Sequence, residues 1–284
     1  MSGTLSNQFV CNEETRLNSA ARAIRRSAVS ILLGAALLAG CASNGGGLST
    51  AGSGVTASDT ARLTRSGFLT DYGRLKRAAV GDGAECWRAA DADLRKYDKV
   101  LISRIVVSIK PSAGGEQTID PSDLKVLTDY FHNSLVKALS PQMKIADKPG
   151  HGVIVIRIAL TDLVPTSVTR SLGGTLIPYG FVAEAGSGVA TGRPAGSTPY
   201  LGETGVEIQF RDGATEAILG ECRDTQIGRK YAADVEAGAA GATETWVSGY
   251  LNSFQSWAYA QDAFDKWSGL IAQRFAELRA APGR

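Results

Sequence analysis

The sequence predicts an α+β fold (an α/β sandwich): a single mixed or antiparallel sheet of about four strands with helices packed on it, preceded by a flexible lipidated tether. Three observations support this fold class. Residues 98–109 and 152–163 are rich in β-branched side chains, which is typical of strands. Apolar and polar residues alternate from residue 206, and the Asp212-Gly213 turn signal predicts a hairpin that returns over 216–226. Two other segments place apolar residues at helical spacing, and packing them on a sheet would bury both.

The first helix is expected to begin after Asp120, because aspartate is a favourable N-cap and Pro121 suits the first helical position. Its core-facing residues are predicted to be Leu124, Leu127, Phe131, Leu135 and Ala138. The last helix is expected over residues 254–279, with an apolar stripe that packs on the core. That stripe consists of Ala260, Phe264, Trp267, Ile271, Phe275 and Leu278, with Lys266, Gln273 and Glu277 outside it.

Residues 1–40 are predicted to be a lipoprotein signal peptide. A segment that ends in three arginines precedes residues 27–40, an apolar run too short to span a membrane. The run ends in Leu38-Ala39-Gly40-Cys41, which resembles the lipobox of bacterial lipoproteins. The resemblance implies that Cys41 is acylated and becomes the first residue of the triacylated mature chain.

Ala42 bears on localisation. In the lipoproteins that this segment resembles, aspartate after the acylated cysteine retains the protein in the inner membrane. Alanine therefore implies export to the outer membrane, with the domain facing the periplasm. The membrane is then a partner through the N-terminal acyl chains.

The mature chain is expected to be a tether and one domain. Residues 41–60 comprise the acylated cysteine and a Gly/Ser-rich linker, whose reach is roughly 25 Å. Residues 61–284 are predicted to form a single periplasmic α/β domain. The full chain has a net charge of +2, and removing the arginine-rich leader leaves the mature chain formally neutral. Nucleic acid is therefore not an expected partner.

Short motifs, in a fixed order along the chain, resemble a bacterial lipoprotein family called domain of unknown function 3313 (DUF3313). They are residues 66–72 (SGFLTDY), 91–94 (DADL), 97–100 (YDKV), 161–165 (TDLVP), 211–215 (RDGAT) and 263–267 (AFDKW). The resemblance covers roughly residues 60–280 and implies the fold and the location, but no established reaction. Where the family's hairpin turn usually ends in glycine, this chain has Glu216.

In addition to the acylated Cys41, two cysteines are expected in the mature chain. Cys11 lies in the leader, so Cys86 and Cys222 stay in the domain. An oxidising periplasm favours a disulfide between them. Two free buried thiols are the alternative.

No catalytic constellation is recognised, and no metal or cofactor is expected. The isolated His132 and His151 do not make a metal site, which usually needs three or four ligands. Ser122 and Lys125 match a Ser-x-x-Lys nucleophile motif, but the companion motifs are absent. We therefore interpret them as part of a first helical turn, and the protein as a non-enzyme.

Five charged residues near the predicted strands are also interpreted structurally. Asp91, Asp93 and Asp98 are expected in a solvated turn and capping region, rather than as acid/base groups. Arg104 and Arg157 each interrupt an apolar strand. Pairing with Asp or Glu is favoured for both arginines over an anion site.

The segment 166–202 is the main candidate for an interaction. It is rich in Gly, Ser and Thr, and its apolar patch includes Leu176, Ile177, Tyr179 and Phe181. Long loops of this kind are often functional. The patch could contact a membrane or a partner, or the loop could fold over a sheet edge.

The leading hypothesis is an outer-membrane-anchored periplasmic lipoprotein that acts as a non-enzymatic structural, assembly or envelope-interaction module with an envelope protein partner. One alternative is a lipoprotein that binds a small envelope ligand, with the segment 166–202 as a lid. The other is a cell-envelope hydrolase whose carboxylates the sequence does not locate.

Overall fold

The computed structural model describes residues 56–78, 83–108, 119–167, 190–194, 197–198, 201–229, 251–252 and 255–281. All of them belong to the unit Gly47–Arg284. The signal peptide, Leu38, Ala39, Gly40 and Cys41 lie outside the described residues, as do Leu176, Ile177, Tyr179 and Phe181. None of the helices in the described ranges is long and apolar enough to cross a membrane.

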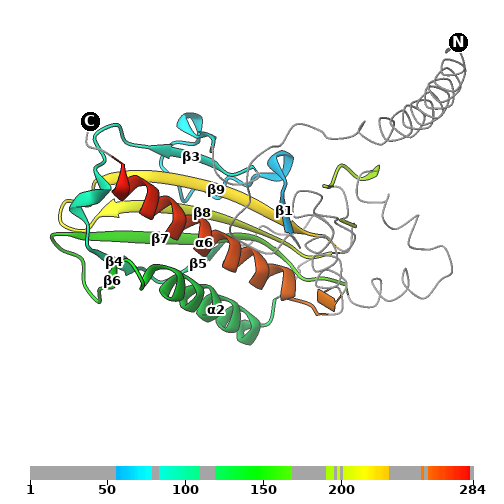
Figure 1. Cartoon of the computed structure of the whole chain (residues 1–284). Coiled ribbons are helices and arrows are strands. Elements are labelled where there is room, and N and C mark those ends of the chain that lie inside the picture. Colours follow the sequence, from blue (N-terminus) through cyan, green and yellow to red (C-terminus); the bar gives the residue numbers. More distant parts are fainter. Residues whose placement is uncertain are drawn as a thin grey trace, which may run out of the picture. The chain divides into compact units, whose positions relative to one another are not determined.

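The described residues build a mixed nine-stranded sheet, in the order β2-β3-β9-β8-β7-β4-β6 (Figure 1). In addition, β1 pairs with β9 and β5 pairs with β7. The long strands β7, β8 and β9 are antiparallel, whereas β4 is parallel to both β6 and β7. The strands are β1 (Thr56–Ser58), β2 (Lys76–Arg77), β3 (Glu85–Arg88), β4 (Lys99–Ile102), β5 (Val106–Ser108), β6 (Lys144–Ile145), β7 (Val153–Val164), β8 (Glu203–Asp212) and β9 (Ile218–Gly228).

The expectation of about four strands is wrong, although the α+β class is confirmed. The predicted strand 98–109 is divided into β4 and β5, which both pair with β7. The strands that the sequence did not predict, β1, β2, β3 and β6, have two to four residues each. Strands this short reach at most the lower end of the four to eight residues over which alternation is recognised.

The domain also begins earlier than residue 61. Thr56 to Ser58 pair with Gly228 to Gln226 of β9, so the expected linker contains a strand of the sheet. Asp59 then caps the short 3-10 helix η1 (Thr60–Arg62) by accepting a hydrogen bond from Ala61 N at 3.1 Å. The glycine-poor end of the expected linker, residues 56–60, is therefore part of the fold.

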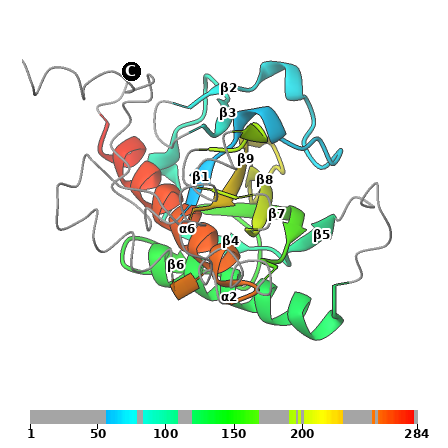
Figure 2. The same cartoon turned by 90° about the vertical axis from the view of Figure 1, so that its right-hand side faces the viewer.

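Two helices, α2 (Pro121–Leu139) and α6 (Ala258–Ala280), lie on the same face of the sheet (Figures 1 and 2). As predicted, Asp120 caps α2: its Oδ1 accepts a hydrogen bond from Ser122 N at 2.8 Å. Phe131 of α2 stacks on Phe264 of α6 with ring centroids 4.6 Å apart. The core lies between these helices and the inward-facing apolar residues of the sheet.

The other face of the sheet is covered by residues 64–74, which we call the strap (Figure 2). It ends in the 3-10 helix η2 (Tyr72–Arg74). Beneath it, Glu207 of β8 and Glu221 of β9 are 1% and 0% exposed. The alternation along β8 is typical of a strand with one solvated face, but the strap buries this polar face too.

The turn between β8 and β9 contains backbone strain. Asp212 Oδ1 accepts hydrogen bonds from the backbone N of Ala214 and Thr215, both at 2.8 Å. Glu216 then has φ 62°, in the left-handed region that favours glycine. The family that the sequence motifs resemble usually has glycine at the position of Glu216. The tight turn therefore forms here with a side chain in the left-handed region, which costs conformational free energy.

Candidate functional site

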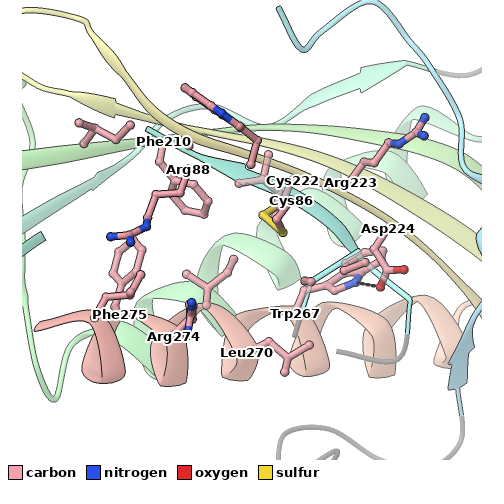
Figure 3. Close-up of a pocket in the computed structure, with 18 of the residues that line it drawn as sticks. Cys86, Arg88, Phe210, Cys222, Arg223, Asp224, Trp267, Leu270, Arg274 and Phe275 are labelled. Atoms are coloured by element: carbon pink, nitrogen blue, oxygen red, sulfur yellow. Dashed lines mark hydrogen bonds between the residues drawn. A yellow bond between two sulfur atoms is a disulfide. The ribbon is translucent and has the colours of Figure 1, made fainter. Parts of the chain in front are cut away.

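A cavity of about 310 Å³ lies between α6 and the β3-β9-β8 part of the sheet (Figure 3). Helix α6 packs on β8 and β9, while β3 and β2 extend the sheet further. The 3-10 helix η3 (Leu94–Lys96) also packs on α6, and its Leu94 lines the cavity. The volume is at the lower end of the range for ligand pockets, roughly 300–1,000 Å³.

The walls of the cavity are mostly apolar. Gly220 of β9 contributes no side chain, and a Cβ there would lie 3.1 Å from the carbonyl oxygen of Trp87. The sheet provides Ile154, Val206, Ile208, Phe210 and Leu219, and the helix provides Trp267, Leu270, Ile271, Phe275 and Leu278. The α6 stripe predicted from the sequence therefore both packs on the core and lines a cavity.

A disulfide between Cys86 and Cys222 forms part of the wall (Figure 3). The two cysteines are directly opposite each other in the β3–β9 pair, on the face that carries α6. Of the two states left open by the sequence, the structure has the bonded one. The bond joins a short strand, β3, to a long central strand, β9.

The inner end of the cavity is polar and buried. Asp224 of β9 is 4% exposed and accepts hydrogen bonds from Trp267 Nε1 at 2.8 Å and from Gln226 Nε2 at 2.6 Å. Burial raises the pKa of Asp224, although these hydrogen bonds oppose the shift. Lys266 Nζ donates to Gln226 Oε1 at 3.1 Å. Lys266 was expected outside the buried stripe, but it is 2% exposed because it belongs to this network.

The rim of the cavity is basic. Lys76 is opposite Cys86 in the β2–β3 pair, and Arg88 follows Cys86 by two residues, so both share the cavity face of the sheet. Arg88 is exposed and donates to the carbonyl oxygen of Ala92 at 3.2 Å. From the helix, Arg274 reaches the same side of the cavity (Figure 3).

The Ser-x-x-Lys residues do not form a nucleophilic pair. Ser122 Oγ donates to Asp120 Oδ1 at 2.6 Å, and Lys125 pairs with Asp129. Both residues are exposed on the first turns of α2. Both belong to the beginning of α2, as the sequence interpretation expected.

The other candidate residues also have structural roles. Asp93 caps the 3-10 helix η3 (Leu94–Lys96), and its hydrogen bonds from Arg95 lower its pKa to about 2. Arg157 Nη1 donates to Gln209 Oε1 at 3.0 Å, a neutral amide rather than the expected carboxylate. Arg104 is exposed between β4 and β5. In the described ranges, no group of three His, Cys, Asp or Glu side chains could hold a metal ion.

Sequence analysis missed the carboxylates under the strap. Glu207 accepts hydrogen bonds from Ser66 N at 3.0 Å and Tyr72 Oη at 2.8 Å. Glu221 accepts one from Thr70 N at 2.9 Å and pairs with Arg74 at 2.6 Å. Burial opposes ionisation of Glu221, but the hydrogen bonds from Arg74, Thr70 and Gln209 outweigh it and lower its pKa.

The strap network explains the motif at residues 66–72. Its serine, threonine and tyrosine all donate to buried carboxylates of β8 and β9. The donors and acceptors are about 140 residues apart in the sequence. That separation is why neither half of the network could be identified from local patterns. We therefore regard the strap face as structural and the cavity as the candidate functional site.

The family model described as "Protein of unknown function (DUF3313)" matches residues 64–271, from the start of the strap into α6. The chain belongs to the DUF3313 family. The resemblance seen in the sequence is thereby confirmed, and the DUF3313 match includes most of the residues that line the cavity. No curated protein matches this DUF3313 sequence.

Several solved structures are similar to this DUF3313 protein. A PelC dodecamer from Paraburkholderia phytofirmans has 13% identity and a TM-score of 0.30, with 61% of this chain and 98% of that chain covered. A DUF330 protein from Xanthomonas campestris has 12% identity and a TM-score of 0.29, with 66% and 92% covered. A DUF4136 protein from Bacteroides thetaiotaomicron has 11% identity and a TM-score of 0.24, with 61% and 96% covered.

Proposed function

We propose that this protein is an outer-membrane lipoprotein, anchored through acyl chains on Cys41, that faces the periplasm and binds a small ligand without catalysing a reaction. The observation that carries the binding function is the apolar cavity between α6 and the sheet. Ligand binding was the second hypothesis from the sequence. Because this cavity is present, we now favour ligand binding over the assembly role.

The cavity supports an elongated apolar group, such as an acyl chain, as the ligand. Its walls come from two layers that face each other, with apolar side chains on both. Burying one methylene contributes about 0.8 kcal/mol, which corresponds to about a fourfold gain in affinity. Affinity for a series of chains should therefore rise with length until the cavity is full.

The site residues support binding rather than catalysis. Asp224 is the one carboxylate among the described residues that line the cavity. Its Oδ2 already accepts hydrogen bonds from Trp267 and Gln226, so it is held as an internal acceptor. General acid–base chemistry needs a group within reach of substrate protons, and glycoside hydrolysis needs a pair of such groups.

Photolabelling tests the proposed cavity. The full-length protein, in native membranes taken up in polymer-bounded discs, is exposed to fatty acids that carry a diazirine on the chain. We expect crosslinks to the peptides of β3, β9 and α6 that line the cavity. Leu270→Trp, which fills the space, should reduce them at least tenfold, whereas Val126→Trp on the exposed side of α2 should not. Equal labelling of both variants would contradict the proposal.

Metabolic labelling tests the anchor independently. Cells that express the full chain are fed an alkyne-bearing palmitate, and the purified protein is analysed for attached lipid. Cys41→Ser should abolish the signal, and the matched variant Cys11→Ser in the leader should retain it. Retained labelling in Cys41→Ser would overturn the anchor.

A further inference from the structure

We infer that the cavity holds a single-chain amphiphile with an anionic group, a carboxylate or a phosphate, at the basic rim formed by Lys76, Arg88 and Arg274. This inference rests on the proposed binding function and specifies the ligand class. It follows from how charge is distributed around the cavity. Lys76, Arg88 and Arg274 are exposed at the rim, whereas the one lining carboxylate in the described chain, Asp224, lies at the buried inner end. Arg223 also lines the cavity, but it is buried and already paired with Glu85.

The three cations approach the opening from both layers. Lys76 comes from the edge strand β2 and Arg88 from its neighbour β3, and Figure 3 shows Arg88 extending from the sheet toward Phe275 and Arg274 rising from α6. Neither Lys76 nor Arg88 has an ion-pair partner within the described ranges. Like charges that converge in this way repel one another, and a bound anion would relieve the repulsion.

Arg274 is available to such a ligand at little cost. Its Nη1 is 2.8 Å from Glu277 Oε2, but both side chains are well exposed, and ion pairs of this kind contribute little to stability. The planar guanidinium groups of Arg88 and Arg274 can each donate two parallel hydrogen bonds to a carboxylate or a phosphate.

Asp224 does not neutralise this rim. Trp267 and Gln226 hold its carboxylate inside the core, on the far side of the disulfide from Arg88 (Figure 3). The site is therefore amphipathic along its length: cationic at the opening, apolar along the walls, and closed by a satisfied polar network. The small volume, about 310 Å³, favours one chain over the two chains of a phospholipid.

The decisive experiment compares two probes with the same chain and the same diazirine position, a fatty acid and a fatty alcohol. Both are applied to the full-length protein in native membrane discs. We expect the acid to label the cavity peptides about tenfold more strongly than the alcohol, the size of one charge-assisted hydrogen bond. In Arg88→Gln/Arg274→Gln, labelling by the acid should fall to the level of the alcohol, and labelling by the alcohol should be unchanged. Arg104→Gln, an exposed arginine between β4 and β5, serves as the matched control.

The outcomes separate the two proposals. Equal labelling of the wild type by acid and alcohol overturns the anionic rim but leaves the cavity function intact. If neither probe labels the wild type above Leu270→Trp, both proposals fail. Unlabelled competitors of the same chain length then identify the source of the anion. Displacement of the probe at a lower concentration of lysophosphatidate than of free fatty acid assigns a phosphate, and the reverse order assigns a carboxylate. Equal displacement by a two-chain zwitterionic phospholipid would overturn the single-chain anion.

Discussion

Arg74 of the strap donates a hydrogen bond to Glu221 of β9 at 2.6 Å, and its guanidinium carbon lies 3.5 Å from the centroid of the Trp87 ring of β3. Glu221 is completely buried, whereas the side chain of Arg74 is 26% exposed. One residue of the strap thus compensates a buried carboxylate and covers an aromatic ring on the neighbouring strand. This contact holds the strap to the sheet.

Removing that guanidinium should destabilise the domain strongly. Arg74→Met leaves Glu221 buried without its cation, which costs about 3 kcal/mol of unfolding free energy. Denaturant unfolding followed by tryptophan fluorescence measures the change. The control is Arg104→Met, an exposed arginine that should change stability by less than about 0.5 kcal/mol. Equal losses in the two variants would contradict the role of the pair.

The acid limb of the stability curve should depend on Tyr97. Tyr97 Oη donates to Asp212 Oδ2 at 2.7 Å, and this bond is the main cause that lowers the pKa of Asp212 from 3.8 to about 2. The folded pKa lies below the unfolded one, so this stability is complete above pH 3.8 and is lost as the pH falls toward about 2. Unfolding measured over that interval should show a shallower decline for Tyr97→Phe than for the wild type. Parallel curves would exclude the link.

The β8–β9 turn offers a stabilising substitution. Glu216 has φ 62°, where a side chain costs about 1–2 kcal/mol relative to glycine. Glu216→Gly removes that strain, and the greater unfolded-state entropy of glycine offsets part of the gain. We expect a net increase in stability of about 1 kcal/mol in thermal unfolding. Glu216→Ala keeps a Cβ at the same φ and should show no comparable increase; an equal gain would point to the charge instead.

The disulfide should make a large contribution to stability. Cys86 and Cys222 are 136 residues apart, and closing a loop of that length stabilises the fold by about 5 kcal/mol in the chain-entropy estimate. Reductant should lower the unfolding midpoint of the wild type and have no such effect on Cys86→Ala/Cys222→Ala. Thiol alkylation followed by mass spectrometry should modify this pair only after reduction. Modification without reductant would show that the bond is absent.

Sequence patterns predicted the long elements well. The Asp120-Pro121 start of α2 and the alternation of β8 are local signals, and each matched an element of the structure. The short strands β1, β2, β3 and β6 were missed because their pairing is decided by partners far along the chain. Tertiary context, rather than local propensity, specifies strands of this length.

The candidate site was less accessible to sequence reasoning. The apolar residues of α6 were correctly expected to be buried, but a stripe does not reveal whether its partner surface is complete. The cavity lies where β2 and β3 extend the sheet beyond β8 and β9, the strands on which α6 packs, and Gly220 of β9 lines it. Lys76, Arg88 and Arg274 share the rim only through the register of β2 with β3 and the placement of α6.

The position of β9 in the sheet sets the order in which the chain can fold. Strand β9 pairs with β1, β3 and β8, and it carries the carboxylate that Arg74 neutralises. A chain that emerges from its N-terminus must therefore release all of β9 before its first three strands can be completed, because long-range pairing waits for the distant partner. A truncation before Ile218 would therefore remove the strand with which both β1 and β3 pair.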